Sequence, residues 1–323
     1  MGKIIEISGI TKKYGNYAAV DNLNLTIEKG EVFGLLGPNG AGKSTTILML
    51  MGLTEPKSGS VKVCGINPTK NPIQVKKKVG YLPEDVGFYD DYTGFENLIY
   101  TARLNGISKT EAKEKASQLL KKVGLADEKD KKVGKYSRGM RQRLGLADVL
   151  IKSPEVIILD EPTLGIDPLG VQEFLELIVE LSRKEGITVL FSSHHLYQVQ
   201  QVCDRVGLFI KGKLLAVGNI EDLAKQLFSG KNCTIEGEIE VSDTENKAKG
   251  KPIKDLVQGL KKQKGVLEVK MEGAHFLIES DSDITASVSK FIVNSGFGLT
   301  NLSKKVFGLD DIYHRYFQGT TSE

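Results

Sequence analysis

The chain is short of the features that mark membrane spans, disulfide frameworks and thiolate metal sites. No apolar run reaches the roughly 18 residues needed to cross a bilayer, and the first residues lack the apolar core of a signal peptide. The three cysteines, Cys64, Cys203 and Cys233, are far apart and match neither a metal-site spacing nor a disulfide framework. We therefore expect a protein of a reducing, cytoplasmic compartment.

The chain also has no large excess of positive or negative charge. The chain has 44 Lys and Arg against 41 Asp and Glu, a net charge of +3, so composition gives no argument for binding nucleic acid, and we expect none. Internal repeats and extended low-complexity tracts are absent too. With 323 residues, 40% hydrophobic and 26% charged, the chain is long enough for one large and one smaller globular domain.

The most informative segment follows a short apolar run that reads as a buried strand, Val32–Leu36, and precedes a helix-like run. It reads Gly37-Pro38-Asn39-Gly40-Ala41-Gly42-Lys43-Ser44-Thr45 and fits the pattern G-x-x-x-x-G-K-[ST]. Glycines let the backbone curl so that N–H groups point inward, and the helix N-terminus adds the positive end of its dipole. Lys43 supplies a cation for the outer phosphates, and Ser44 is placed to bind Mg²⁺. The segment predicts a nucleoside triphosphate site; the alternative is a glycine-rich turn without a ligand.

A second element ends an apolar run with two adjacent carboxylates. Residues 156–159 read as a strand, and Asp160 and Glu161 follow. If this strand lies beside the phosphate-binding loop, Asp160 reaches the Mg²⁺ shell and Glu161 reaches the γ-phosphate, where a water needs a base or an orienting acceptor. The alternative is two acids that cap the next turn.

A third element lies between the first two and reads Tyr136-Ser137-Arg138-Gly139-Met140. A serine followed by a glycine at the start of a helix offers a hydroxyl, N–H groups and a helix dipole to an anion. The alternative is that Ser137 is an ordinary helix N-cap.

On these elements and their order, residues 3–220 resemble the ATP-binding subunits of ABC transporters. The resemblance implies that Tyr14 stacks on adenine, although it could also be a loop aromatic. It implies that Ser137, Arg138 and Gly139 belong to the ABC signature, that Asp167 lies in a loop that crosses a dimer seam, and that His194 contacts the γ-phosphate.

Two positions depart from the family pattern. The usual signature L-S-G-G-Q carries Arg138 in place of its first glycine, and Glu84 stands where the family has a glutamine. Glu84 could hold Mg²⁺ or a water. Both departures, and an additional C-terminal domain, resemble the subgroup that serves type-2 ABC exporters.

The expected fold is α/β, with a mostly parallel P-loop NTPase-type sheet, antiparallel strands and a helical subdomain over about residues 85–150. Residues 1–228 would form this ATP-binding domain, and residues 229–323 a small α+β domain. Buried strands are expected at 32–36, 79–82, 156–159, 188–191 and 206–210, an outer antiparallel strand at 4–10, and one helical region over 94–123. The C-terminal part reads β-α-β-β-α, with a final helix from Asp310.

The resemblance implies an ATPase that binds ATP and Mg²⁺, closes as a head-to-tail dimer of identical or different subunits, and drives a membrane-spanning permease from the inner face of the cell membrane. Phe88, Tyr89, Tyr92 and Phe95 are either core residues or anchors for that permease. Two alternatives remain open: a soluble ABC ATPase in translation or DNA maintenance, and a nucleotide sensor that does not hydrolyse ATP.

Overall fold

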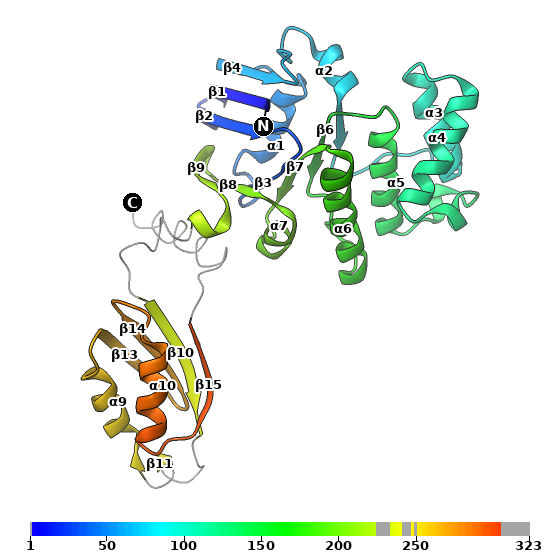
Figure 1. The fold of residues 1–323 in the computed structure, drawn as a ribbon. Coiled ribbons are helices and arrows are strands. Elements are labelled where there is room, and N and C mark those ends of the chain that lie inside the picture. The colour runs from blue at the N-terminus through cyan, green and yellow to red at the C-terminus, as the bar shows by residue number, and fades with distance from the viewer. Residues whose placement is uncertain (1, 224–232, 241–246, 249–250, 305–323) are drawn as a thin grey trace. The chain divides into compact units, whose positions relative to one another are not determined.

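A computed structural model describes residues 2–223, 233–240, 247–248 and 251–304. The described residues fall into two compact units, one ending at Leu223 and one beginning after it (Figure 1). The predicted domain boundary at residues 228–229 and the predicted helix from Asp310 lie outside the described residues. Within the described part of the chain, no helix is long and apolar enough to cross a membrane.

The first unit is built on a six-stranded sheet in the order β5-β6-β7-β3-β8-β9. Its strands are β3 (Val32–Leu36), β5 (Val79–Leu82), β6 (Val156–Asp160), β7 (Thr188–Ser193), β8 (Arg205–Ile210) and β9 (Lys213–Gly218). All neighbours are parallel except β8 and β9. The five predicted buried strands are confirmed, because continuous apolar runs suit strands covered on both faces.

A second, antiparallel sheet in the first unit has the order β2-β1-β4. It contains β1 (Lys3–Tyr14), β2 (Tyr17–Glu28) and β4 (Ser58–Val63). The predicted antiparallel strand at 4–10 is confirmed as part of β1, which is longer than expected. Its predicted outer position was wrong, because β1 pairs with β2 on one side and β4 on the other and is the central strand of this sheet. The sequence analysis missed β2, β4 and β9.

The helices of the first unit are α1 (Lys43–Leu50), α2 (Pro72–Lys78), α3 (Gly94–Leu104), α4 (Lys109–Lys122), α5 (Arg138–Leu150), α6 (Pro168–Glu185) and α7 (Leu196–Val202), with short 3₁₀ turns at Ala126–Glu128 and Val133–Lys135. Figure 1 shows α3, α4 and α5 together at one end of the unit, which confirms a helical subdomain. The expectation of one helical region over 94–123 was wrong in detail. Gly106 has a left-handed φ of +81° and Ser108 caps a new helix by accepting from Glu111 N–H, so the region divides into α3 and α4.

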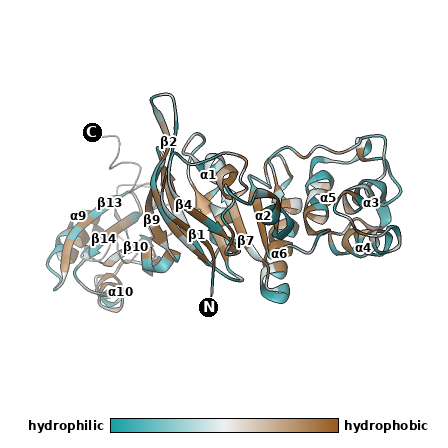
Figure 2. Cartoon of the chain, turned by 90° about the horizontal axis from the view of Figure 1, so that it is seen from above, coloured by the Kyte–Doolittle hydropathy of each residue, from teal (hydrophilic) through white to brown (hydrophobic). Residues whose placement is uncertain are grey.

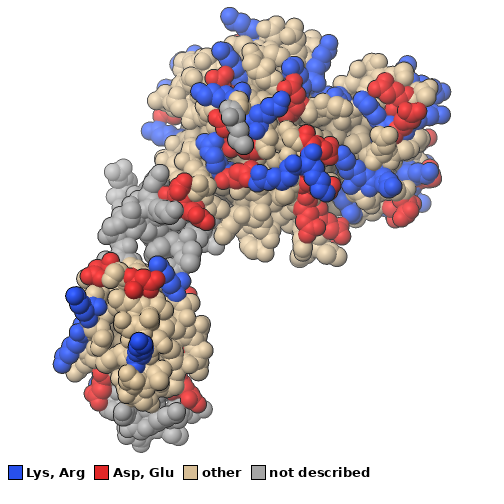
Figure 3. All heavy atoms as spheres, in the orientation of Figure 1, with Lys and Arg blue, Asp and Glu red and all other residues tan. Residues whose placement is uncertain are grey.

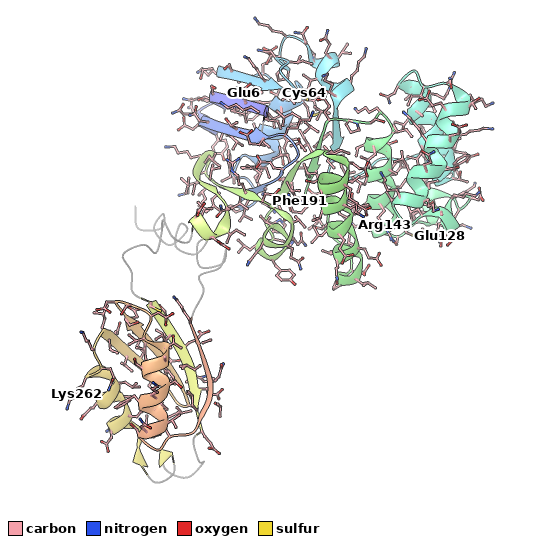
Figure 4. All side chains as sticks on the ribbon, in the orientation of Figure 1. Glu6, Cys64, Glu128, Arg143, Phe191 and Lys262 are labelled. Atoms are coloured by element: carbon pink, nitrogen blue, oxygen red, sulfur yellow. The ribbon has the colours of Figure 1, made fainter. Side chains whose placement is uncertain are left out.

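Apolar side chains of the central strands make the core of the first unit. Figure 2 shows this core as hydrophobic strands between helices whose outer sides are hydrophilic. Phe191 in β7, labelled in Figure 4, is fully buried. On the face drawn in Figure 3, basic and acidic side chains of this unit are interspersed. The α/β fold class is confirmed.

The second unit is a four-stranded antiparallel sheet with two helices. The sheet order is β13-β14-β10-β15. Its elements are β10 (Cys233–Ile239), α9 (Ile253–Lys261), β13 (Val266–Glu272), β14 (His275–Ser280), α10 (Thr285–Asn294) and β15 (Leu299–Lys304), with a two-residue pairing of β11 (Lys247–Ala248) and β12 (Lys251–Pro252). Its separate core includes Ile235, Leu260 and Ile292. The predicted β-α-β-β-α order is present, and β15, which was not predicted, completes the sheet.

Candidate nucleotide site

The phosphate-binding loop connects β3 to α1 and packs against neighbouring backbone. A Cβ atom on Gly37 would lie 2.2 Å from the Phe209 carbonyl oxygen. Gly42 has a φ of +109°, and a Cβ atom there would lie 2.3 Å from the Ala19 carbonyl oxygen. Only glycine satisfies both the conformation and the close approach at position 42. Gly42 also caps α1 without any side-chain hydrogen bond to the first helical N–H groups, so these donors suit an anion.

Lys43 is the first residue of α1, and its side chain turns back into the loop. Its exposed fraction is 5%. The Nζ atom donates to the Gly37 carbonyl at 2.6 Å and to the Pro38 carbonyl at 3.3 Å, and it lies 3.2 Å from Glu161 Oε1 in an ion pair. The cation is therefore held where the loop and the end of β6 meet.

The two carboxylates sit at the carboxyl end of β6, at the same edge of the sheet as the loop. Asp160 pairs in register with Ser192 of β7, and its Oδ1 atom is buried without a hydrogen-bond partner among the described residues. Burial, with Asp160 as a second cause, raises the pKa of Tyr81 on β5 to about 12. Asp160 is thus a buried carboxylate with spare acceptor capacity.

Glu161 has an unusual backbone. Its φ of +47° lies in the left-handed region, a conformation that costs about 1–3 kcal/mol for a residue with a side chain. Its N–H donates to the Ser192 carbonyl at 3.0 Å, and its carboxylate contacts both Lys43 and His194. These contacts from separate elements hold the strained residue in place.

His194 lies just after β7, with its Nδ1 atom 2.9 Å from Glu161 Oε2. The adjacent His195 ring lies 4.0 Å from that of His194, between centroids. Burial, and secondarily His194, lower the pKa of His195, which favours the neutral ring. His195 is the N-cap residue of α7 and makes no side-chain cap bond.

The signature segment begins α5. Ser137 is the N-cap residue, and its Oγ atom accepts from the Met140 N–H at 3.2 Å. Ser137 is therefore a helix N-cap within this chain, as the alternative interpretation proposed. Its hydroxyl hydrogen can still be donated to another acceptor. Tyr136 is buried and donates its hydroxyl to the Glu128 carbonyl at 2.7 Å, so this position of the signature supports the subdomain.

The loop at residues 165–167 lies against the start of α5. A Cβ atom on Gly139 would be 3.3 Å from Ile166 Cγ2, and one on Gly165 would be 2.8 Å from Arg138 Cδ. Asp167 caps α6 by accepting from the Gly170 N–H at 3.0 Å. Among the described residues, no hydrogen bond or ion pair joins this cluster to the phosphate-binding loop.

Tyr14 and Glu84 occupy more exposed positions. Tyr14 is 51% exposed near the turn between β1 and β2. Tyr17, across that turn, donates its hydroxyl to the Gly40 carbonyl at 3.2 Å, so this turn touches the phosphate-binding loop. Glu84 follows β5 with an exposed side chain, and its carbonyl accepts from Gln142 Nε2 at 2.9 Å. The sequence analysis missed Tyr17 and Gln142, because their partners are backbone atoms that no motif specifies.

The donors near the loop suit Mg²⁺ shared with a phosphate. Ser44 lies in the first turn of α1, and Asp160 offers its partnerless Oδ1. No group of three or more His, Cys, Asp or Glu side chains in the described part of the chain could hold a metal ion alone. Mg²⁺ usually takes one or two protein ligands and completes its shell with phosphates and water, so these residues fit that ion.

Comparison with known proteins decides the family. A family model described as "ABC transporter" matches residues 20–164. The bacitracin transport ATP-binding protein BcrA of Bacillus licheniformis is 43% identical over 226 residues, which cover 70% of this chain and 73% of the relative. The chain belongs to the ATP-binding proteins of ABC transporters. Family membership confirms the resemblance and makes the chain an ATPase, as expected.

Other ABC transporter ATP-binding proteins extend the match. The linearmycin resistance ATP-binding protein LnrL of Bacillus subtilis is 38% identical, covering 69% of this chain and 72% of the relative. An uncharacterized ABC transporter ATP-binding protein of the same species, YhaQ, is 34% identical over 298 residues, covering 91% of this chain and 92% of its own length. The match to YhaQ therefore extends into the second unit.

Solved structures of ABC ATPases agree with the fold. CbiO1 of Clostridium perfringens, part of the ABC transporter complex CbiONQ, has a TM-score of 0.64 at 28% identity, covering 71% of this chain and 92% of CbiO1. A dimeric ATP-binding cassette bound to ADP and phosphate has a TM-score of 0.61, covering 67% of this chain and 98% of that one. At 24% identity it supports the fold alone.

Proposed function

We propose that this ABC ATPase drives a type-2 exporter from the inner face of the cell membrane, with ATP and Mg²⁺ bound at the edge where β3, β6 and β7 end. The carrying observation is the contact of Glu161 with both Lys43 and His194 beside the phosphate-binding loop. The exporter assignment is supported by relatives named for bacitracin transport and linearmycin resistance. Phosphate release on addition of ATP, in the presence and absence of the membrane partner, tests it.

Several residues of this chain have separate roles at the γ-phosphate. Glu161 accepts the proton of the attacking water or orients that water, because its carboxylate is buried and fixed from two sides. His194 holds one oxygen of Glu161, and its ring can donate to the phosphate. Lys43 and the N–H groups at the start of α1 bind the phosphate oxygens. Mg²⁺, held by Ser44 and Asp160, would neutralise charge on the phosphates when bound.

The second half of each site would come from another ATPase subunit, of the same or a different chain. Ser137 and Gly139 lie at the N-terminus of α5, and neither bonds to the phosphate-binding loop within the described residues. A head-to-tail dimer would place them on the γ-phosphate of the partner's ATP. ATP would then stabilise the closed dimer, and hydrolysis would remove that preference. This change in population supplies the movement that the permease uses.

Glu84 is proposed as a ligand of Mg²⁺, either directly or through water. Glu84→Ala is expected to raise the Mg²⁺ concentration needed for half-maximal ATPase activity several-fold, since one oxygen ligand is lost. A Mg²⁺ titration of activity at saturating ATP measures this, with Glu114→Ala, an exposed carboxylate on α4, as the control. An unaltered titration would limit Glu84 to a structural role.

The permease contact is assigned to an exposed cluster of three tyrosines, Tyr89, Tyr92 and Tyr100. Tyr89 lies 5.4 Å from Tyr92 and 5.1 Å from Tyr100 between ring centroids, and the three are 53%, 45% and 40% exposed. Phe88 and Phe95, by contrast, pack against the core of the helical subdomain. The core alternative therefore fits the two phenylalanines, and the anchor alternative fits the tyrosines.

Replacing Tyr89 and Tyr92 together by alanine is expected to abolish co-purification with the membrane protein encoded alongside, while ATPase activity of the isolated subunit changes less than twofold. Exposed aromatic rings lose little on truncation in the isolated protein but are strong anchors in an interface. Tyr197→Ala is a matched control, because Tyr197 is 72% exposed on α7. Normal permease binding by the double variant would exclude the tyrosine cluster as the docking site.

The second unit is proposed to be an independent domain that does not take part in nucleotide chemistry. A chain ending at Phe228 is expected to fold and to bind ATP with an affinity within a few-fold of the full chain, since every matched motif lies in the first unit. Circular dichroism and titration with a fluorescent ATP analogue measure this. A folded truncation that fails to bind ATP would show that the second unit completes the site.

A further inference from the structure

We propose that Gln142 is a positioning residue that forces the Glu84 loop to move together with helix α5. This rests on the proposed roles of Ser137 at the start of α5 and of Glu84 after β5. Gln142 lies in the second turn of α5 and is 2% exposed. Its Nε2 atom donates to the Glu84 carbonyl at 2.9 Å, across 58 residues of sequence.

The amide oxygen of Gln142 shows that the buried position does not by itself account for a glutamine here. Its Oε1 atom is buried and has no hydrogen-bond partner among the described residues. A buried acceptor without a partner is destabilising, and an apolar side chain of similar size would avoid that cost. The hydrogen bond from the amide nitrogen to the Glu84 carbonyl is the contact that offsets this cost.

Side-chain packing before and after Glu84 also joins α5 to the Glu84 loop. Gly145 lies three residues after Gln142, and a Cβ atom there would be 2.6 Å from Leu82 Cδ1 and 3.2 Å from Val86 Cγ2. Leu82 and Val86 flank Glu84, so α5 touches the segment before and after the hydrogen bond. A close-packed contact of this kind transmits displacement, because it has no space to absorb it.

Two ion pairs join the same two segments. Arg138 Nη2 lies 3.8 Å from Asp85 Oδ1, and Arg141 Nη2 donates to Asp90 Oδ1 at 2.6 Å. Both pairs are exposed and so add little stability, but they keep the first two turns of α5 aligned with residues 85–90. The tyrosine cluster begins at Tyr89, within this segment.

The consequence is a single piece that carries Ser137, Glu84 and the tyrosine cluster. A permease that displaces the cluster would move the signature of one ATP site and the Glu84 side chain of another at the same time. Breaking the Gln142 bond should weaken the connection at Glu84 itself, while the packing at Gly145 and the two ion pairs remain.

Gln142→Met tests this, because methionine has similar length and apolar volume but donates no hydrogen bond. Hydrogen–deuterium exchange is followed in residues 83–88 and in the first turn of α5, with and without Mg²⁺ and ATP. In the unmodified chain we expect nucleotide to slow exchange in both segments. In Gln142→Met the slowing in α5 should persist, and that in residues 83–88 should fall by more than half.

Arg143→Ala is the matched control. Arg143, labelled in Figure 4, is on the same helix, and its Nη1 atom donates to Glu173 Oε2 of α6 at 3.1 Å. This variant should behave like the unmodified chain. If Gln142→Met does not fold, Gln142→Asn replaces it, since asparagine keeps the amide but is too short to reach Glu84.

A double-variant cycle gives a second readout. Gln142→Met should raise the Mg²⁺ requirement as Glu84→Ala does, and the combined variant should show no further rise. Two results would overturn the proposal. One is a combined variant whose rise in Mg²⁺ requirement equals the product of the two single effects. The other is a Gln142→Met chain in which nucleotide slows exchange in residues 83–88 as much as in the unmodified chain. If Glu84→Ala leaves the Mg²⁺ requirement unchanged, the proposed metal role of Glu84 fails, and the exchange comparison alone decides the role of Gln142.

Discussion

Glu161→Gln lowers the rate of ATP hydrolysis by about 100-fold or more, the scale of a lost general base, and leaves ATP binding within a few-fold of the unmodified chain. Glutamine keeps the shape of the side chain, but its amide cannot accept the proton of the attacking water. The Lys43 and His194 contacts, at 3.2 and 2.9 Å, lose their charged partner as well. Phosphate release and binding of a fluorescent ATP analogue measure the two effects separately.

The same variant should accumulate an ATP-bound dimer, which size-exclusion chromatography with light scattering detects. Glu155→Gln is the matched control, because Glu155 precedes the other end of β6 and pairs with Lys78 in an exposed ion pair. Turnover at the normal rate in Glu161→Gln would remove Glu161 from the proposed mechanism, whatever the oligomeric state.

Lys43→Ala abolishes measurable ATPase activity and weakens ATP binding about 100-fold, the scale of one or two charge-assisted hydrogen bonds. Lys43 is the buried cation at the phosphate-binding loop, and alanine leaves Glu161 without its ion-pair partner. Isothermal titration with ATP and steady-state turnover measure the losses.

Lys113→Ala is the control for Lys43→Ala, since Lys113 is an exposed lysine on α4. Thermal unfolding shows whether the orphaned Glu161 carboxylate also lowers stability. Retention of normal turnover by Lys43→Ala would contradict the assignment of the whole loop.

The sequence was sufficient wherever a local pattern determines both structure and chemistry. The loop from Gly37 to Thr45 could be placed between a strand and a helix because its glycines, lysine and serine are local requirements. The continuous apolar runs of β3 and β6 predicted buried parallel strands, and their shared edge brings Lys43 to Glu161.

Features that depend on contacts between distant segments could not be predicted. The Tyr17 hydroxyl and the Gln142 amide each bind a backbone carbonyl far along the chain, and residue type alone does not specify such a partner. The division of α3 from α4 depends on the left-handed Gly106 and on the cap that Ser108 makes, and the sequence analysis considered neither residue. The interpretation of the aromatics after β5 required burial, which separates Phe88 from Tyr89.

The left-handed backbone of Glu161 is strained, but its carboxylate stabilises the same site. Glycine at this position would adopt a φ of +47° without strain and would relieve about 1 kcal/mol or more, yet it would remove the carboxylate. Loss of the carboxylate would also leave the buried Lys43 ammonium without its ion-pair partner and the His194 ring without its hydrogen bond, and an unpaired buried charge costs more than the backbone strain that glycine relieves. Glycine at this position would therefore be tolerated only together with a change that also removes the charge of Lys43.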